Sequence, residues 1–433
     1  MRLRLAAAGL GLLALGAACR TPRGFDPAPE IERALAALRE GNVELASALL
    51  QRLRRRASGD ATVAEWTALV AELTWDDAAA AQHYASAIRL LLGAKVADHA
   101  DRIADLRGRL GELLFRSGRH GEAIDALRLG AVGAAATRRL ALANLAERLP
   151  YQRQTSGPLL TEVARLPGEL PEFLCGTAAQ QRPFAVDTGT STTAMVRSVA
   201  VELGVRDLQP AGSAHDAAGR SLPVAVGVLE PLRIGDLDLG PVPVLVVDDE
   251  LLRLRDGHGG ATHVPVGVLG LDLVGSFRLT LDAERESLVL ELPRGLRTEE
   301  SVACVRADGR CLVPVVVDDT RLWFVLDTGA SHSSLTPAGL RELPGGAGRA
   351  SPGYRRIWAL GGSQVAVREV RALALKVSAA AFREVVLPVV ERAGGGRESS
   401  SDLFPVHGVL GFDLLGRCRV VLDQGRCRIE GVR

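Results

Sequence analysis

Apolar residues recur at helical spacing through the first part of the chain, residues 27–150, which is rich in Ala and Leu and almost free of strand signals. Residues 33–53 predict two amphipathic helices joined at Gly41-Asn42, and residues 109–131 repeat that design. Helices paired in this way bury their apolar faces against each other. We therefore expect an all-α region over residues 27–166.

The helical segments resemble tetratricopeptide repeats at Leu110-Gly111, Leu114, Gly118 and Ala123. That resemblance implies helix pairs stacked into a solenoid, whose concave surface would bind a protein partner. A plain helical bundle that acts as a spacer is the alternative.

After Pro167 the pattern changes to short Val and Leu runs broken by Gly, Pro and Asp, as in residues 241–249 and 313–319. Such runs are typical of strands in an all-β fold. We expect two β lobes, residues 167–295 and residues 300–433, because a motif occurs once in each.

The motif has two parts in each copy. Asp187-Thr188-Gly189-Thr190 is followed by the segment GVLGLDLVGSFRLTLD, which starts at Gly267. Asp327-Thr328-Gly329-Ala330 is followed, at almost the same separation, by GVLGFDLLGRCRVVLD, which starts at Gly408. One Asp-Thr-Gly is weak evidence, but two copies with the same second part indicate a duplication.

In each copy an apolar strand ends at an Asp, and the glycine two residues later permits a sharp turn and a close approach of another segment. The second part ends its apolar run at Gly270 or Gly411, as a strand crossing beneath the loop requires. Each half should therefore hold one carboxylate on a rigid, partly buried loop.

Each half resembles an aspartic protease lobe of retropepsin size, and the pair resembles a pepsin-type bilobal arrangement. The resemblance implies that Asp187 and Asp327 are the catalytic pair, that Thr188 and Thr328 brace the two loops, and that Gly189 and Gly329 are the turn glycines. It implies hydrolysis of a peptide or protein substrate with no metal and no cofactor.

Two carboxylates at hydrogen-bonding distance share one proton, so one member can activate water while the other donates to the developing oxyanion. The Thr190 hydroxyl could donate to Asp187, whereas Ala330 offers Asp327 no such donor. On this ground we expect Asp187 to be the ionised base and Asp327 the proton donor.

Two segments midway between the motif parts could form flaps over an extended substrate, residues 213–221 with His215 and residues 354–364 with Tyr354 and Trp358. His332 and His407 flank the second lobe's motifs. They could line the cleft, but ordinary surface or packing roles are the simpler interpretation.

Residues 1–19 have basic residues, a short apolar run and small residues ending at Cys19, the layout of a secretory signal. They resemble a bacterial lipoprotein signal, which implies lipidation of Cys19 and a membrane anchor. Plain export after Ala18 and a short core segment are the alternatives. An exported chain would lie in the cell envelope facing the periplasm, and a lipidated one most simply on the outer membrane.

Composition narrows the choice of partner further. Lys plus Arg number 52 against 51 for Asp plus Glu, so the net charge of +1 gives no reason to expect a nucleic acid as a partner.

In an oxidising compartment disulfides are permitted but not required in a protein of this size. If Cys19 is lipidated, the mature thiols are odd in number, and their pairing stays open: Cys175, Cys304, Cys311, Cys418 and Cys427.

Three functions remain open from the sequence. The leading one is an exported aspartic endopeptidase with both carboxylates in one molecule. The second is a non-catalytic peptide-binding protein on the same fold, and the third is a protease that is active only as a homodimer. The linker between the lobes, residues 292–301, is short and favours association within one chain.

Overall fold

The computed structural model describes residues 25–94, 99–130, 140–142, 160–215, 221–249, 265–359, 363–390 and 403–432. The predicted signal sequence, with Cys19, lies outside these residues. No helix in the described part of the chain combines the length and the apolar character that a membrane crossing requires.

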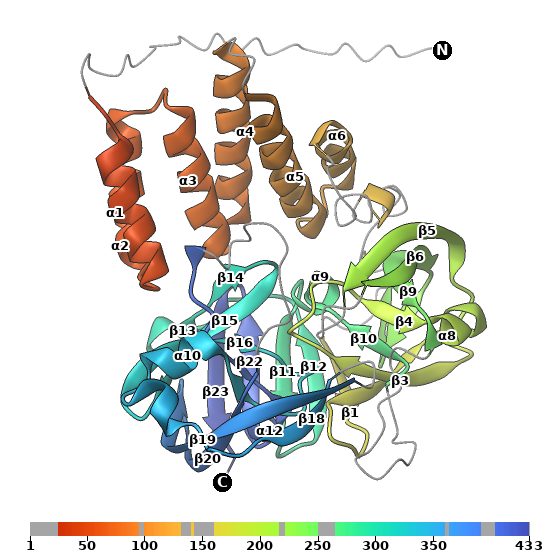
Figure 1. Cartoon of the computed structure of the whole chain (residues 1–433). Coiled ribbons are helices and arrows are strands. Elements are labelled where there is room, and N and C mark those ends of the chain that lie inside the picture. The colour runs from red at the N-terminus through yellow and green to blue at the C-terminus, as the bar shows by residue number, and fades with distance from the viewer. Residues whose placement is uncertain are drawn as a thin grey trace, which may run out of the picture.

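The first region is a row of helices (Figure 1). In chain order they are α1 Ala28–Arg39, α2 Val43–Arg56, α3 Ala61–Leu73, α4 Asp77–Gly93, α5 Ala100–Arg116 and α6 His120–Gly130. Asn42, Asp60 and Asp76 begin α2, α3 and α4, because each side-chain oxygen accepts a hydrogen bond from a main-chain N–H of the first turn.

Each of these helices packs against the next one in the chain. Small residues allow the close contacts: Ala46 and Ala123 are fully buried, and a Cβ on Gly111 would lie 2.5 Å from Leu127 Cγ. The paired helices predicted from the sequence are therefore present. Their identity as tetratricopeptide repeats stays a prediction.

The β region divides into lobe 1, residues 160–291, and lobe 2, residues 302–432. Most strands of lobe 1 form a nine-stranded sheet in the order β5-β6-β9-β4-β10-β3-β2-β7-β8. These strands are β2 Glu172–Gly176, β3 Gln181–Val186, β4 Ala194–Val196, β5 Arg206–His215, β6 Ser221–Leu229, β7 Leu232–Ile234, β8 Leu237–Leu239, β9 Val242–Val247 and β10 Gly267–Leu269. Two short helices, α8 Arg197–Glu202 and α9 Leu271–Val274, follow β4 and β10.

Lobe 2 has an eight-stranded sheet in the order β14-β15-β16-β21-β17-β20-β19-β18. Its strands are β14 Val305–Ala307, β15 Arg310–Val317, β16 Thr320–Leu326, β17 Ser334–Leu335, β18 Arg355–Ala359, β19 Ser363–Val377, β20 Ala380–Val389 and β21 Gly408–Leu410. Its helices include α10 Pro337–Glu342 and α12 Phe412–Leu415.

The duplication read from the sequence is also present in the topology. In lobe 1 the strand β10 lies parallel to β3 and antiparallel to β4, and in lobe 2 the strand β21 lies parallel to β16 and antiparallel to β17. In both lobes, therefore, the strand from the second motif part is inserted between the two strands that flank the Asp-Thr-Gly loop.

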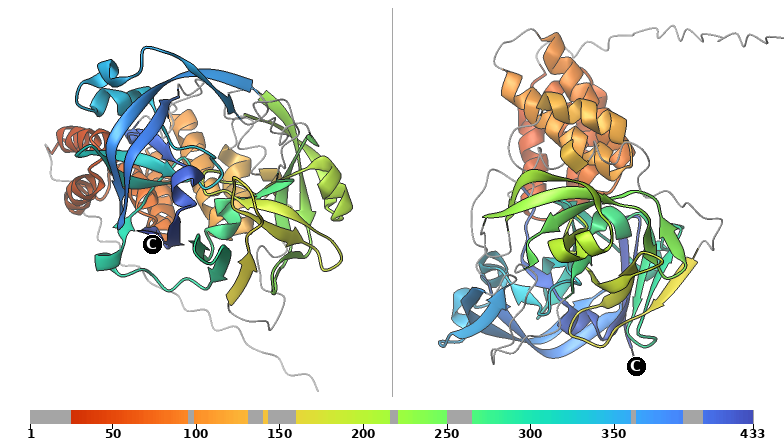
Figure 2. Two further views of the ribbon diagram at one scale, coloured as in Figure 1. Left: turned by 90° about the horizontal axis from the view of Figure 1, so that it is seen from below. Right: turned by 90° about the vertical axis from the view of Figure 1, so that its right-hand side faces the viewer.

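A six-stranded sheet joins the two lobes, in the order β1-β12-β11-β22-β23-β13. Its strands are β1 Leu160–Ala164, β12 Ser287–Glu291 and β11 Arg278–Asp282 from lobe 1, and β22 Cys418–Asp423, β23 Arg426–Gly431 and β13 Val302–Ala303 from lobe 2. The junction is the antiparallel pair β11–β22, where Leu279 pairs with Leu422 and Leu281 with Val420. Seen from below, the lobes lie side by side around this sheet (Figure 2).

One predicted boundary needs correction. The helical region was expected to extend to residue 166, but β1 begins at Leu160 and pairs with β12 of lobe 1. Five residues with weak alternation carry too little signal for a strand whose only partner lies far along the chain.

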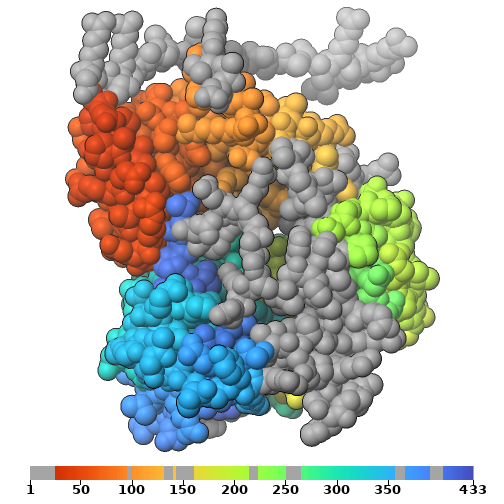
Figure 3. Space-filling model, viewed as in Figure 1, coloured from red at the N-terminus to blue at the C-terminus, as the bar shows by residue number. Residues whose placement is uncertain are grey.

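The first three helices pack on lobe 2 rather than standing apart from the β region (Figure 3). Apolar residues of α1, α2 and α3 share one core with Trp323 and Phe404. Gly41 in the α1–α2 turn approaches so closely that a Cβ there would lie 2.4 Å from Trp323 Nε1. Beside this core, Arg306 of β14 forms an ion pair with Asp77 and stacks 3.8 Å over the Trp75 ring.

Candidate active site

The two Asp loops have the same local geometry. The N–H of Asp187 donates to the carbonyl of Leu269, and the N–H of Asp327 donates to that of Leu410, at 3.1 and 3.0 Å. Each aspartate follows the buried last residues of a strand, β3 or β16. The neighbouring inserted strand therefore fixes the point where the chain leaves the sheet.

Main-chain donors hold one oxygen of each carboxylate. Asp187 Oδ1 accepts from the N–H groups of Gly189 and Thr190 at 2.8 and 3.1 Å. Asp327 Oδ1 accepts from Gly329 and Ala330 at 3.0 and 2.9 Å. The second oxygen of each carboxylate is left for other partners.

The two carboxylates face each other across the junction of the lobes. A Cβ on Gly189 would lie 2.3 Å from Asp327 Cγ, and a Cβ on Gly329 would lie 2.3 Å from Asp187 Cγ. Each carboxylate thus occupies space that only a glycine in the opposite loop leaves open. The structure brings Asp187 and Asp327, separate in sequence, into one site.

Thr188 and Thr328 link the two loops below the carboxylates, and both are almost completely buried. Thr188 Oγ1 donates to the carbonyl of Leu326 at 2.7 Å and accepts from the N–H of Thr328 at 3.1 Å. Thr328 Oγ1 donates to Val186 at 2.6 Å and accepts from the N–H of Thr188 at 3.1 Å. This reciprocal network holds the two loops in register, as the resemblance implied.

Gly270 and Gly411 lie beneath the loops. A Cβ on Gly270 would lie 2.6 Å from the Thr192 carbonyl carbon, and one on Gly411 would lie 2.6 Å from that of His332. Both glycines therefore allow the close approach that the motif predicted.

A second pair of interactions braces each loop, and sequence reasoning did not assign it. In lobe 1, Thr193 Oγ1 donates to Asp272 at 2.8 Å and accepts from the N–H of Gly270. In lobe 2, Ser333 Oγ donates to Asp413 at 2.6 Å and accepts from the N–H of Gly411. The signal was available, because both motif copies place a hydroxyl and an Asp at equivalent positions.

Burial raises the pKa of both carboxyl groups, and the negative charge of Asp327 raises the pKa of Asp187 further. Two such groups retain one proton between them at a pH where an isolated aspartate would be fully ionised. The pair therefore contains one acid and one base.

The positive charge of Arg310 acts on Asp327. Gly309, at the tip of the β14–β15 hairpin, lies against the Asp187 loop, since a Cβ there would be 3.0 Å from Ser191 Cβ. Arg310 follows it, and its positive charge opposes the effect of burial by lowering the pKa of Asp327. No sequence signal identified Arg310, because only the fold brings this hairpin to the site.

The hydrogen bonds of the two loops do not favour Asp187 over Asp327 as the ionised member. Among the described residues the Thr190 hydroxyl forms no hydrogen bond with Asp187, and the bond that Thr190 does make uses its main-chain N–H. Ala330 makes the same bond to Asp327, so these two residues do not distinguish the carboxylates. Burial raises the pKa of Asp327, while hydrogen bonds from Ala330, Asp187 and Gly329 and, last, the charge of Arg310 lower it.

The ends of both predicted flap segments lie on paired strands, whereas residues 216–220 and 360–362 between those strands lie outside the described part of the chain. β5 and β6 pair up to His215 and Ser221, and β18 pairs with β19 from Arg355 to Ala359. The side chains of His215 and Trp358 lie outside the described part. Tyr354 is 74% exposed.

The remaining candidate residues have ordinary surroundings. His407 is buried, and its Nδ1 accepts from the N–H of Trp323 at 2.9 Å, which is a packing role. His332 is exposed and contacts Ser331 Oγ.

The five cysteines in the described residues are buried, and none of them forms a disulfide. Within the same residues no group of three His, Cys, Asp or Glu side chains could hold a metal ion.

Comparison with known proteins covers the two lobes. Residues 175–273 and residues 313–414 each match the family described as aspartyl protease, and each match contains one Asp-Thr-Gly and the associated glycine. Among solved structures the chain is similar to a retropepsin-like aspartic protease from Rickettsia conorii, with 22% identity and a TM-score of 0.22. That alignment covers 31% of this chain and 90% of the Rickettsia chain. No curated protein matches the chain. The two family matches support an aspartic protease.

Proposed function

We propose that this chain is an aspartic endopeptidase in which Asp187 and Asp327 of one molecule activate a water for peptide hydrolysis. The observation that carries the proposal is the opposition of the two carboxylates, each seated against the glycine of the other loop. A fold kept only for packing would not need two carboxylates buried side by side, because burying charge is unfavourable without a function or a partner.

The proposed reaction uses the single proton of the pair. Asp327, ionised beside Arg310, accepts a proton from the water as its oxygen attacks the peptide carbonyl carbon. Asp187, protonated, donates a hydrogen bond to the carbonyl oxygen as negative charge develops there. The proton taken from water then passes to the leaving nitrogen as the carbon–nitrogen bond breaks.

An extended substrate fits this arrangement. The β5–β6 and β18–β19 hairpins occupy equivalent places in the two lobes, and we propose that they form flaps over a peptide that lies between the lobes. Hydrogen bonds to the peptide main chain would fix its direction, as in other cases where a peptide adds as a strand.

A site within one molecule is favoured over a homodimer. Strands β11 and β22 already pair the two lobes of the same chain through four residue pairs, and Thr188 and Thr328 bind each other's loops. Pairing of like lobes between two chains would require both sets of contacts to break. A non-catalytic peptide-binding protein is the second candidate, and it is distinguished by experiment.

We further propose that the protein is exported and works in the cell envelope, attached through a lipid on Cys19. The support is the charge and hydropathy pattern of residues 1–19. Metabolic labelling with a radioactive fatty acid, beside a Cys19→Ser variant, tests the lipid anchor. Equal labelling of both proteins would contradict it.

The test of the activity is cleavage of a peptide library by the wild-type fragment without residues 1–19, from about pH 3 to about pH 7. We expect internal cleavage of peptides with a bell-shaped dependence on pH. An Asp327→Asn variant should bind peptides but not cut them. Binding without cleavage by the wild-type protein at every pH would instead support the peptide-binding alternative.

A further inference from the structure

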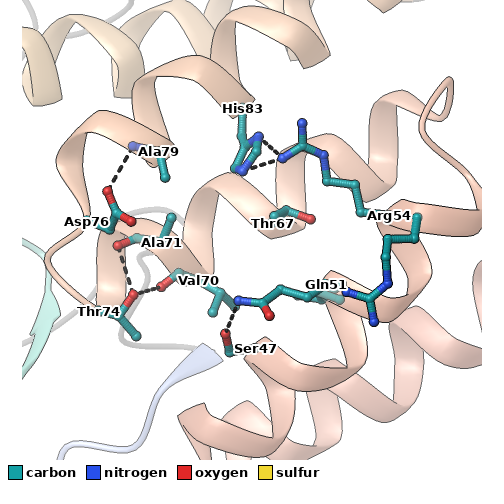
Figure 4. Close-up of a pocket in the computed structure, with 12 residues that line it drawn as sticks. Ser47, Gln51, Arg54, Thr67, Val70, Ala71, Thr74, Asp76, Ala79 and His83 are labelled. Carbon is teal, nitrogen blue, oxygen red and sulfur yellow. Dashed lines mark hydrogen bonds between the residues drawn. The ribbon is translucent and has the colours of Figure 1, made fainter.

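A groove in the helical region has no role in the proposed reaction. It lies between α2 and α4, with α3 as its floor, and has a volume of about 440 Å³ (Figure 4). That volume is within the range of sites that bind ligands in proteins, roughly 300 to 1,000 Å³. Ser47, Gln51 and Arg54 line one side, and His83 lines the other.

The groove is positively charged. Arg54 and Arg55 both line it, and within the described residues neither forms an ion pair with a carboxylate. The guanidinium of Arg54 instead points to the ring of His83, which is buried (Figure 4). Asp76 is the one carboxylate among the lining residues, and its oxygen caps α4 by accepting from the N–H of Ala79. The charge of the two arginines is therefore available to a ligand.

The floor of the groove is made of short side chains, so it can accommodate a main chain. Thr67, Ala71 and Thr74 of α3 lie along it, and the hydroxyls of both threonines are already bonded to carbonyls of their own helix. Gln51 lies on the rim, where its amide donates to Ser47 Oγ at 3.3 Å. The polar groups able to select a ligand are thus gathered on α2, around the two arginines.

The groove adjoins the β region at one end. Thr74 and Asp76 line the groove, and the residues that alternate with them, Trp75 and Asp77, make the contacts with Arg306 of lobe 2. A polypeptide bound in the groove would therefore lie on helices that pack directly on the β region that carries Asp187 and Asp327.

We propose that this groove binds an acidic segment of a polypeptide, with Arg54 and Arg55 pairing with its carboxylates. The inference deepens the proposed function and rests on it, because a protease acts on polypeptides and a second contact outside the cleft would select among them. Charge complementarity of this kind contributes to selectivity and to the rate of association, and it weakens with salt.

Binding is measured with full-length protein carrying Asp327→Asn, so that the probe is not cut. The probe is a fluorescein-labelled peptide with a run of glutamates, and the matched probe has glutamines at the same positions. We expect the glutamate probe to bind, the glutamine probe to bind at least about tenfold more weakly, and added salt to reduce the difference. Equal binding of the two probes, or no binding of either, would overturn the proposal.

Matched double variants locate the site. Arg54→Gln with Arg55→Gln should weaken binding of the glutamate probe at least about tenfold. Arg39→Gln with Arg89→Gln removes the same charge from exposed helix surfaces outside the groove and should leave the affinity unchanged. Equal weakening by both double variants would mean that only the net charge matters and would contradict a site.

Two further outcomes are distinguished by the same proteins. The protein could bind vesicles of anionic lipid through Arg54 and Arg55 and yet fail to bind the glutamate probe. That outcome would contradict the proposal and would identify the groove as a membrane-binding surface. The binding assay does not depend on cleavage, so a wild-type protein that cuts no peptide would refute the proposed function while leaving this result intact.

Discussion

Replacement of Thr328 by Val removes one hydroxyl and keeps the size of the side chain. That hydroxyl donates to the carbonyl of Val186 and accepts from the N–H of Thr188. Both main-chain groups belong to the opposite loop, and Thr188 is 1% exposed, so water cannot readily replace the lost partner. The variant therefore leaves one buried carbonyl and one buried N–H without hydrogen bonds.

The expected loss follows from the cost of unsatisfied buried groups. Each unpaired main-chain group destabilises a protein by about 1 to 3 kcal/mol, so the two groups that Thr328→Val leaves unpaired should lower the free energy of unfolding by roughly 2 to 6 kcal/mol. That is a large part of the ~5 to 15 kcal/mol that stabilises a typical domain. Because the network also sets the separation of the carboxylates, the same variant should reduce kcat more than it raises KM.

Urea unfolding followed by near-ultraviolet circular dichroism measures the first effect, and peptide cleavage below the unfolding transition measures the second. Thr328→Ser is the matched control, since it retains the hydroxyl and should stay within about 1 kcal/mol of the wild-type protein. By symmetry Thr188→Val should resemble Thr328→Val. A Thr328→Val protein as stable and as active as Thr328→Ser would refute the role given to this network.

Three further changes test other parts of the structure. Arg310→Gln removes a positive charge that lowers the pKa of Asp327. The pKa of Asp327 should therefore rise, and the acid limb of the kcat/KM profile should move to higher pH. An unmoved limb would contradict the proposed role of Asp327 as the base. Gly329→Ala places a methyl group against the Asp187 carboxylate and should reduce activity roughly a hundredfold. The control Gly348→Ala should leave activity unchanged, because Gly348 has open space around it. Equal activities of the two variants would show that the loops are not closely opposed. Arg306→Gln removes the ion pair with Asp77 and the stacking on Trp75, through which the helices contact lobe 2. The free energy of unfolding in urea should fall by about 1 to 3 kcal/mol. An unchanged free energy of unfolding would show that this contact is not needed to hold the helices on lobe 2.

The parts of the site that depend on local sequence could be predicted. The strand that ends at Asp187, the glycine two residues later and the later Gly270 form a pattern, and its repetition around Asp327 fixed the interpretation. The paired helices were also predictable, because their spacing of apolar residues and their turn residues lie close together in the chain.

The parts that depend on distant contacts could not be predicted. The pairing of β11 with β22 joins strands from separate lobes, and nothing local in either strand specifies its partner. The influence of Arg310 on the pKa of Asp327 depends on the β14–β15 hairpin, whose Gly309 lies against the Asp187 loop, and nothing local in the sequence indicates it. The packing of the helices on Trp323 likewise needs the assembled lobe 2 as its surface.

The central claim is that Asp187 and Asp327 of one molecule form a single catalytic pair. The most direct test is peptide cleavage by Asp187→Asn, by Asp327→Asn and by an equimolar mixture of the two, each compared with the wild-type protein at equal concentration. We predict that both variants and their mixture are inactive, since no molecule in the mixture carries both carboxylates. Cleavage by either single variant, or recovery of activity in the mixture, would contradict the claim.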